Sequence, residues 1–325
     1  YLFTGTGLSI FSAAVTWIPI LLGRIVSWFG KGIRGSLRDA MLSESVDPEV
    51  RGRAFGFHRA GDTVGAIIGP LAGIALLSVL PRAFPNATPD APFRTIFLLS
   101  LVPGLCAPLV FALMVRETAR RPRPQMKLIA SIRQLPRVFR RFLVSVGLFG
   151  AGDFSPTLLT LAAVILLRSA HGPVRAAQLA ALLYAIRNIV YAAAAFPIGA
   201  LADRMPKLPL LAGGYFCEAF AAAWLALLFT RSSASFAMLA IVFVVSGIFA
   251  AAKDTLEGAI PPDLTDAESR GTVYGTLGAV NGGGDLLASA LTGTLWTAVS
   301  PVAAFSVAAG LMTIGATSVV LTARR

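Results

Sequence analysis

Charged residues are scarce in this sequence, which excludes an ordinary soluble domain. Asp, Glu, Lys and Arg make up 14% of the 325 residues, while hydrophobic residues make up 56%; a soluble domain is roughly a quarter charged. The mean hydropathy is +0.74. Because a helix satisfies its own backbone hydrogen bonds in lipid, this composition predicts an all-α membrane protein with several spanning helices.

Cysteine and histidine are also rare, with two of each. Cys106 and Cys217 both lie in apolar runs, so they indicate neither a disulfide framework nor a metal site, and we interpret them as packing residues. The sequence contains no nucleotide-binding P-loop and no nucleophile–base arrangement. We therefore expect neither an enzyme nor an ATP-driven pump, and no cofactor.

Acidic residues are outnumbered by basic ones, 16 against 28, which gives a formal net charge of +12. No basic segment is interleaved with aromatic residues, so we expect no nucleic-acid partner. The basic residues instead sit in short loops, above all in 116–141. Because Lys and Arg accumulate in cytoplasmic loops, this segment and the C-terminus are predicted to face the cytoplasm.

The 116–141 segment also contains apolar residues at helical spacing, namely Leu128, Ile129, Ile132 and Leu135. This pattern favours a linker followed by an amphipathic helix that lies in the membrane interface. A charged loop that only fixes the orientation of the chain is the alternative.

Windows of about 20 mostly apolar residues predict ten spanning helices. Their ranges are 1–13, 15–45, 53–80, 93–115, 142–168, 177–201, 208–230, 234–260, 271–298 and 301–322. The first range is short and the chain starts at Tyr1 rather than Met. We therefore expect a truncated N-terminus.

An internal repeat relates the two halves of the chain. At an offset of 219 residues, Val26, Ser27, Asp47, Glu49, Arg51, Gly52, Gly56 and Gly65 recur as Val245, Ser246, Asp266, Glu268, Arg270, Gly271, Gly275 and Gly284. The second half has six predicted helices and the first only four, so two helices are expected to precede Tyr1.

Glycines follow a defined spacing on the predicted helix 53–80. Gly56 is followed by Gly65, Gly69-Pro70 and Gly73. Gly61, Gly65, Gly69 and Gly73, at four-residue steps, form a flat ridge that another backbone can approach closely, and Pro70 removes one internal hydrogen bond. The spacing resembles the antiporter motif of the major facilitator superfamily, departing from it at Ile74. Helix packing with no bearing on transport direction is the alternative.

A second motif runs from Gly199 through Asp203 and Arg204 to Lys207. It is similar to the loop motif between the eighth and ninth helices of the same family. The resemblance implies that Asp203 accepts hydrogen bonds from the free amides of the helix that starts near Gly52, at the positive end of its dipole, and so latches the cytoplasmic side. The stretch 30–56 further resembles a bacterial subgroup, largely without assigned substrates, that carries GKG, RDA and RGRAFG.

The resemblance covers the chain from the family's third helix to its twelfth. It implies a two-bundle helical fold with a pseudo-twofold repeat and about ten of twelve helices present: an N-terminal bundle over 1–115, a basic cytoplasmic linker over 116–141 and a six-helix bundle over 142–325. It also implies a monomer in the bacterial inner membrane, with the lipid bilayer, protons and a small-molecule substrate as its partners.

Charged residues inside predicted spans are candidates for function, because ionised groups are costly in a bilayer. The candidates for a cytoplasmic gate are Arg34, Arg38, Asp39, Asp203, Arg204, Lys207, Lys253, Asp254 and Glu257. The repeat places Glu257 where the first half has Arg38, so we expect Arg38 to pair with Glu257 or Asp254. The pair would be either a gate that opens or a permanent structural contact.

Deeper candidates follow from helix position in the family. For proton coupling they are Asp62, Asp153, His58 and Asp285, with Asp62 and Asp153 preferred; for the substrate cavity they are Arg24, Lys31, Arg59, Arg187, Asn188 and Asn281. A carboxylate at such depth takes up a proton more readily. The alternative is that Asp153 or Asp285 merely neutralises Arg187.

Three functional hypotheses follow. The first is a proton-coupled secondary transporter that exports small organic molecules by alternating access, which the glycine motif favours. The second is a proton symporter or uniporter of an anionic metabolite, which the basic stripe of Arg24, Lys31 and Arg34 favours. The third is a transport-inactive membrane scaffold or sensor, motivated by the missing front helices.

Overall fold

The computed structural model describes residues 10, 16–83, 91–114, 135–231 and 234–324. Within these ranges all regular structure is helical, which confirms the predicted class. The chain forms two compact units, Tyr1–Arg38 with Ile68–Ala130, and Asp39–Ile67 with Ser131–Arg325. The predicted span 1–13 and most of the predicted amphipathic helix lie outside the described residues.

The first unit contains the start of α2 (Trp17–Ser45), the end of α3 (Arg51–Ala83), α4 (Ala91–Leu99) and α5 (Leu101–Met114). At Ser100 the hydrogen bonds continue, from the Ser100 amide to the Ile96 carbonyl at 2.9 Å and from the Gly104 amide to the Ser100 carbonyl at 3.2 Å. The two short helices therefore form the one span predicted over 93–115.

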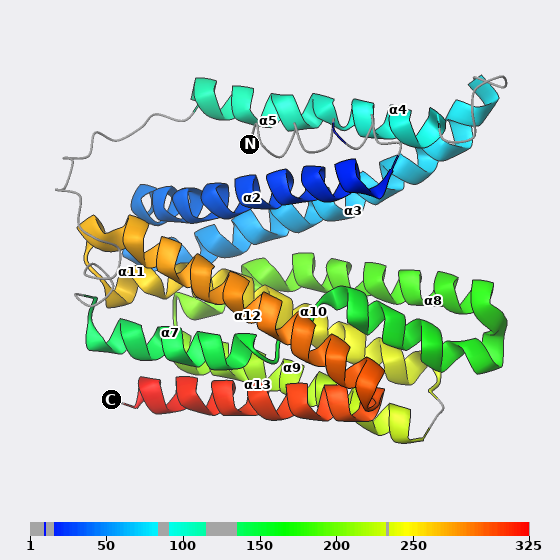
Figure 1. The fold of residues 1–325 in the computed structure, drawn as a ribbon. Helices are drawn as coiled ribbons and strands as arrows, with labels where there is room; N and C mark the ends of the chain where they lie inside the picture. Colours follow the sequence, from blue (N-terminus) through cyan, green and yellow to red (C-terminus); the bar gives the residue numbers. More distant parts are fainter. Residues whose placement is uncertain (1–9, 11–15, 84–90, 115–134, 232–233, 325) are drawn as a thin grey trace. The chain divides into compact units, whose positions relative to one another are not determined.

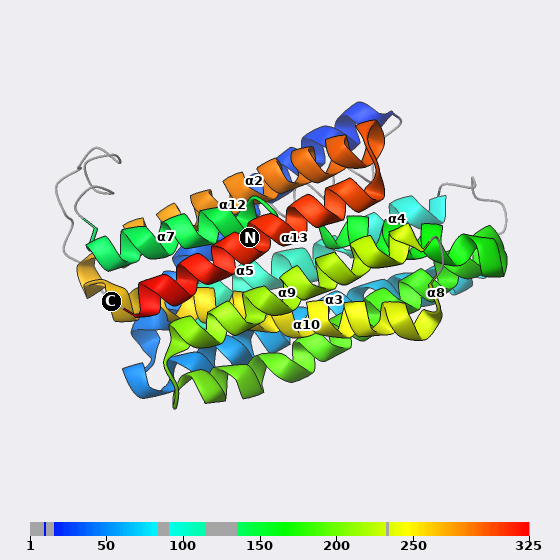
Figure 2. The same ribbon diagram turned by 90° about the horizontal axis from the view of Figure 1, so that it is seen from below.

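The second unit holds the rest of α2 and α3 together with the remaining elements. These are η1 (Pro48–Val50), α7 (Arg137–Gly150), α8 (Pro156–Ala202), α9 (Lys207–Thr230), α10 (Phe236–Ala259), α11 (Pro261–Leu264), η2 (Ala267–Ser269), α12 (Arg270–Ala298) and α13 (Pro301–Ala323). Figures 1 and 2 show α7, α9 and α13 running side by side.

Three helices in this unit begin with a serine that caps them. Ser155, Ser235 and Ser300 precede α8, α10 and α13, and each side chain accepts a hydrogen bond from an amide of the first turn. These bonds satisfy donors that a helix leaves free at its N-terminus.

The predicted span 142–168 is wrong as a single helix. Helix α7 ends at Gly150 and α8 begins at Pro156, so the span is interrupted. The start of α7 at Arg137 also places the last residues of the predicted linker in a helix. Further on, α8 consists of two helices that meet at Gly172, whose φ of 73° a residue with a Cβ rarely adopts.

Five stretches of the described residues combine the length and apolarity needed to cross a membrane: Arg94–Met114, Arg175–Ala202, Lys207–Thr230, Phe236–Leu264 and Pro301–Ala323. The predicted spans 15–45, 53–80 and 271–298 correspond to α2, α3 and α12, and the predicted span 142–168 corresponds to α7 and the first part of α8. Together with the five stretches, these helices agree with the prediction of about ten spanning helices.

The internal repeat is visible in the helix boundaries. Trp17 and Phe236, which start α2 and α10, are separated by the offset of 219, as are Arg51 and Arg270, which start α3 and α12. A small buried cluster consists of two such pairs, Ala40 with Ala259 and Phe55 with Tyr274. The Phe55 and Tyr274 rings stack with centroids 6.5 Å apart. Repeat-equivalent residues that contact each other are expected near a pseudo-twofold axis.

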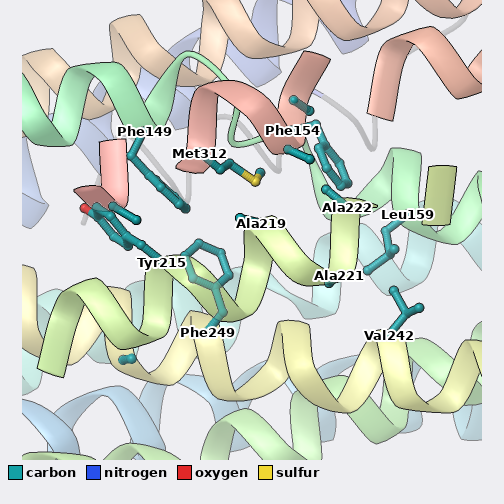
Figure 3. Packing of buried hydrophobic residues seen from close by; sticks show 14 of the residues in the cluster. Phe149, Phe154, Leu159, Tyr215, Ala219, Ala221, Ala222, Val242, Phe249 and Met312 are labelled. Atoms are coloured by element: carbon teal, nitrogen blue, oxygen red, sulfur yellow. The ribbon is translucent and has the colours of Figure 1, made fainter. Parts of the chain in front are cut away.

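Aromatic residues fill the core of the second unit where α7, α9 and α10 meet (Figure 3). The Phe149 ring stacks on Tyr215 with centroids 3.6 Å apart, and Phe249 lies 5.3 Å from Phe149. A Cβ on Gly315 of α13 would collide with the Phe149 backbone. The close approach of α13 therefore holds Phe149, and through it Tyr215, in one position.

Phe149→Ala is expected to destabilise the protein by about 3 to 5 kcal/mol, because Phe149 is fully buried and its removal leaves a cavity. Thermal unfolding in detergent measures the effect. The control is Phe220→Ala, since Phe220 is 50% exposed and should shift the midpoint far less. Equal shifts for the two variants would contradict the packing described above.

Candidate functional site

Helix α10 carries three charged side chains, Lys253, Asp254 and Glu257, in an otherwise apolar sequence. Lys253 and Glu257 are one turn apart and share a face, whereas Asp254 points about 100° away. Each of the three meets partners from different helices, as described below. Helix α10 therefore collects the ionisable groups of the second unit around itself.

Lys253 forms an ion pair with Asp153, and their side chains are 16% and 11% exposed. The Lys253 ammonium also lies 6.0 Å from the centroid of the Phe249 ring. Glu257, Asp285 and Asp254 are close enough to stabilise its charge further. A partly buried cation thus lies among several carboxylates, one of which contacts it directly.

Asp153 occupies the interruption between α7 and α8. The amides of Gly152 and Asp153 donate to the carbonyls of Phe149 and Gly150, at 2.9 and 3.1 Å, which are turn bonds rather than α-helical ones. A Cβ on Gly152 would lie 2.7 Å from the Ala308 carbonyl of α13. The broken backbone, packed closely against α13, directs Asp153 to α10.

Glu257 is 4% exposed and both of its oxygens accept hydrogen bonds. Tyr215 of α9 donates to one oxygen, and the Asn281 amide of α12 donates to the other at 2.6 Å. The Tyr215 ring is the one stacked on Phe149 (Figure 3). This carboxylate is therefore held by neutral donors, and the positive charge of Lys253 also acts on it.

Asp254 accepts a hydrogen bond from Tyr191 of α8. Next to it, Arg59 of α3 donates to the Asp254 backbone carbonyl at 3.1 Å and to the Asp39 carboxylate at 2.9 Å. Arg59 and Asp39 are 17% and 14% exposed. Arg59, predicted to line a cavity, thus joins two predicted gate residues.

Asp62 lies one turn from His58, with 3.5 Å between the ring nitrogen and the carboxylate. It also lies 3.9 Å from the Arg59 guanidinium. Its side chain is 48% exposed, far more than that of Asp153. Of the two preferred carboxylates, Asp153 is therefore the one in a buried environment.

Arg187 of α8 donates to the Ser246 hydroxyl at 3.0 Å, and Ser246 donates to Glu218 of α9 at 3.2 Å. The alternative in which Asp153 neutralises Arg187 is wrong, because Asp153 pairs with Lys253. Asn188 is buried beside Arg187.

Glu218 is 3% exposed and was not among the predicted site residues, because family position makes its helix peripheral. The sequence signal that could have identified it is an acidic residue in so apolar a helix.

The Asp203 carboxylate binds the start of α3 through three hydrogen bonds. It accepts from the Gly52 amide at 2.6 Å, the Arg53 amide at 3.1 Å and the Arg53 guanidinium at 3.0 Å. A Cβ on Gly52 would collide with the Gly199 carbonyl, and one on Gly199 with the Gly52 carbonyl. The predicted contact is thus present, and both glycines are needed for it.

A second contact lies beside this one. Lys207 pairs with Asp263, and the Asp263 carboxylate also lies 3.4 Å from the Arg51 guanidinium. The Arg51 side chain donates in addition to the Ser43 carbonyl at 3.3 Å. Two ion pairs and one hydrogen bond therefore join the end of α2, the start of α3, the start of α9 and α11 next to the Asp203 contact.

A family model described as Major Facilitator Superfamily matches residues 1–172 and 146–325, which together span the chain. The chain belongs to the major facilitator superfamily. It is therefore a multi-pass membrane protein of a transporter family and not an enzyme.

Several relatives of this major facilitator are themselves uncharacterised. An MFS-type transporter of Methanocaldococcus jannaschii is 28% identical over 288 residues, 88% of this chain and 67% of that protein. A protein of Mycobacterium tuberculosis is 37% identical over 75 residues, 23% of this chain and 18% of that protein. These matches support the family and name no substrate.

Solved structures of the superfamily share the fold. The human organic anion transporter MFSD10 has a TM-score of 0.62 and covers 98% of this chain and 75% of its own. A bacterial homologue of the iron transporter ferroportin, in an outward-facing state, has a TM-score of 0.68 and covers 95% of this chain and 73% of its own. Both are 15% identical to this chain, so the likeness concerns the fold alone.

The remaining predicted site residues lie on or beside the helices of this major facilitator, and apart from Asp285, whose charge acts on Lys253, they take part in none of the polar contacts described above. They are Arg24, Lys31, Arg34 and Arg38 on α2, Gly56, Gly65, Gly69, Pro70 and Gly73 on α3, Arg204 after α8, and Asp285 on α12. The side chains of Arg24 and Pro70 lie outside the described part of the structure. Pairing of Arg38 with Asp254 or Glu257 would join the two units and stays a prediction.

Gly56 is the one motif glycine with a defined packing role in the described contacts. A Cβ there would collide with the Ala195 carbonyl of α8. Together with Gly52 and Gly199, it lets the backbones of α3 and α8 approach closely. This favours the packing interpretation for the first glycine of the motif, whatever the motif implies about transport direction.

Proposed function

We propose that this protein is a proton-coupled secondary transporter that exports small organic molecules by alternating access. The ion pair of Lys253 and Asp153 is the observation that carries the proposal. The pair joins a carboxylate at the break between α7 and α8 to a cation on α10, so a proton that took the place of the cation would separate the two elements. Ionisable groups at this depth typically mark the pathway of a substrate or proton.

The proton would act on the contact between α10 and the interruption. Protonation of Asp153 removes its negative charge and with it the attraction for Lys253. The ammonium then remains near Glu257, Asp254 and Asp285, which keep it compensated. The interrupted backbone of residues 151–155 is freed from α10, and a segment without regular helical hydrogen bonds is suited to move.

The Asp203 contact would serve as the cytoplasmic latch of the cycle. It closes when the carboxylate meets the amides of Gly52 and Arg53, and it must break for the cytoplasmic side to open. The direction of transport rests on the resemblance of the Gly56 to Gly73 spacing to the family's antiporter motif. In this proposal the protein works as a monomer in the bacterial inner membrane, with its C-terminus in the cytoplasm. Its partners are the lipid bilayer, protons and a small organic substrate.

Everted membrane vesicles provide the test. With an acidified lumen, the protein should release luminal protons when given its substrate, and a panel of lipophilic cations and anions would identify one. Asp153→Asn should abolish this signal, whereas Glu268→Gln, an exposed acid of the second unit, should retain it. A panel with no proton-releasing compound, or full signal in Asp153→Asn, would overturn the proposal.

Uptake of an anionic metabolite is the second candidate. Arg187 is buried and the Lys253 side chain is only 16% exposed, and a cation that loses its carboxylate to protonation can bind an anion instead. Whole cells distinguish the two modes: uptake of an organic anion that rises on external acidification supports symport, whereas proton release in everted vesicles supports export.

A further inference from the structure

A cavity of about 420 Å³ lies between the start of α7 and the end of α13, away from the charged residues of α10. Three arginines line it: Arg137, Arg140 and Arg141. They follow one another at i, i+3 and i+4, so they share one face of α7. Among the described residues none of these guanidinium groups has an acidic partner, and all three side chains are exposed.

The local backbone favours an anion beside this cluster. The arginines stand in the first two turns of α7, where the helix dipole is positive and repels cations. Pro136 precedes the helix and has no side-chain group to cap its free amides, and the first turn contains no acidic residue. An anion at this place would compensate the guanidinium charges and the free amides together.

The floor of the cavity supplies no further donors. The Ser145 hydroxyl donates to the Arg141 carbonyl at 3.0 Å, the Ser318 hydroxyl lies 2.8 Å from Ser145, and Thr322 donates to the Ser318 carbonyl at 2.9 Å. These hydroxyls are used within the protein. Recognition therefore falls to the guanidinium groups, which suit a phosphate group with oxygens on several sides.

An apolar path continues from the arginines along the same two helices. Val144 and Leu321 line the cavity and are 61% and 57% exposed. Leu148, one further turn along α7 on the same face, and Ile314 on α13 are exposed as well. The basic end followed by exposed apolar residues matches the shape of a phospholipid, with a phosphate head and acyl chains.

We propose that this groove binds an anionic phospholipid, with the headgroup phosphate between Arg137, Arg140 and Arg141 and an acyl chain along Val144 and Leu321. Basic pockets between spanning helices are suited to such headgroups. The positive-inside pattern places this end of the chain at the cytoplasmic leaflet. A lipid here would hold α7 against α13 just before the interruption that contains Asp153.

Native mass spectrometry of the full chain tests the proposal, using dioleoylphosphatidylglycerol and dioleoylphosphatidylcholine as probes. The protein should retain phosphatidylglycerol in preference to phosphatidylcholine. Replacing all three arginines by Gln should weaken phosphatidylglycerol binding on the order of 100-fold, at about fivefold for each basic residue. Replacing them by Lys should restore most of the binding.

The matched control removes three exposed arginines elsewhere, Arg168, Arg175 and Arg231, and should leave the lipid preference unchanged. Val144→Ser with Leu321→Ser should also weaken phosphatidylglycerol binding, because the acyl chain loses its apolar contacts. Equal lipid retention by the Gln variant and the wild type would overturn the proposal. So would displacement of the lipid by equimolar inorganic phosphate, because the site would then bind phosphate without acyl chains.

Discussion

Asp153→Asn is expected to abolish proton-coupled transport and to destabilise the protein by about 3 kcal/mol. The substitution leaves Lys253 buried without its direct partner, and breaking a buried ion pair by removing one member typically costs 3 to 5 kcal/mol. The neighbouring carboxylates of α10 and α12 place the expected cost at the lower end of that range. Lys253→Met should cause a comparable loss, because Asp153 then stays buried and unpaired.

The double variant Asp153→Asn with Lys253→Met separates a structural role from proton coupling. Replacing both charges by neutral side chains should recover most of the stability. Proton release in everted vesicles should stay at background, because no titratable group remains at the interruption. A double variant that is stable and still couples substrate to protons would assign the pair a structural role only.

Asp203→Asn is expected to open the cytoplasmic side. Its carboxylate accepts three hydrogen bonds at the start of α3, and a hydrogen bond to a charged group contributes about 1.5 to 3 kcal/mol. Losing roughly 2 kcal/mol from the latched state shifts the equilibrium more than tenfold. Gly199→Val should act in the same direction, because its side chain would collide with the Gly52 carbonyl.

A buried cysteine reports this opening. In a background without Cys106 and Cys217, Ala259→Cys places a thiol in the small cluster with Ala40 and Phe55, where Ala259 is fully buried. A membrane-impermeant maleimide should label it at least tenfold faster in the Asp203→Asn variant. Asp266→Asn, an exposed acid, is the control. Equal labelling rates in all variants would show that Asp203 does not hold the cytoplasmic side shut.

The helix boundaries of the repeat could be predicted because both halves use the same local chemistry. Asp47 and Asp266 each precede a short turn that leads into Arg51 and Arg270 at a helix start. Windows of mostly apolar residues predicted these helices, and the offset of 219 residues related the helices of one half to those of the other. The Asp203 contact was predictable through the family resemblance, which implies the helix that starts near Gly52 as its partner; the carboxylate alone indicates only that it can accept from the free amides of some helix start.

The interruption at 151–155 was missed because window averages of hydropathy do not register a break in an apolar run. The run around it contains Gly150, Gly152 and Pro156, which together are turn chemistry, and Asp153 stands among them. Tyr191 and Tyr215 were missed for another reason: a tyrosine in an apolar helix is ordinarily interpreted as packing. Their roles depend on which carboxylate of α10 their hydroxyls reach, and spacing along one helix does not determine that.

Proton release by the purified protein tests the central claim most directly. In weakly buffered detergent solution, adding the substrate found in the vesicle screen should release protons from the wild type and from Glu268→Gln. The account predicts no release from Asp153→Asn at saturating substrate. Release from Asp153→Asn equal to that of the wild type would contradict it, because the displaced proton would then come from another group.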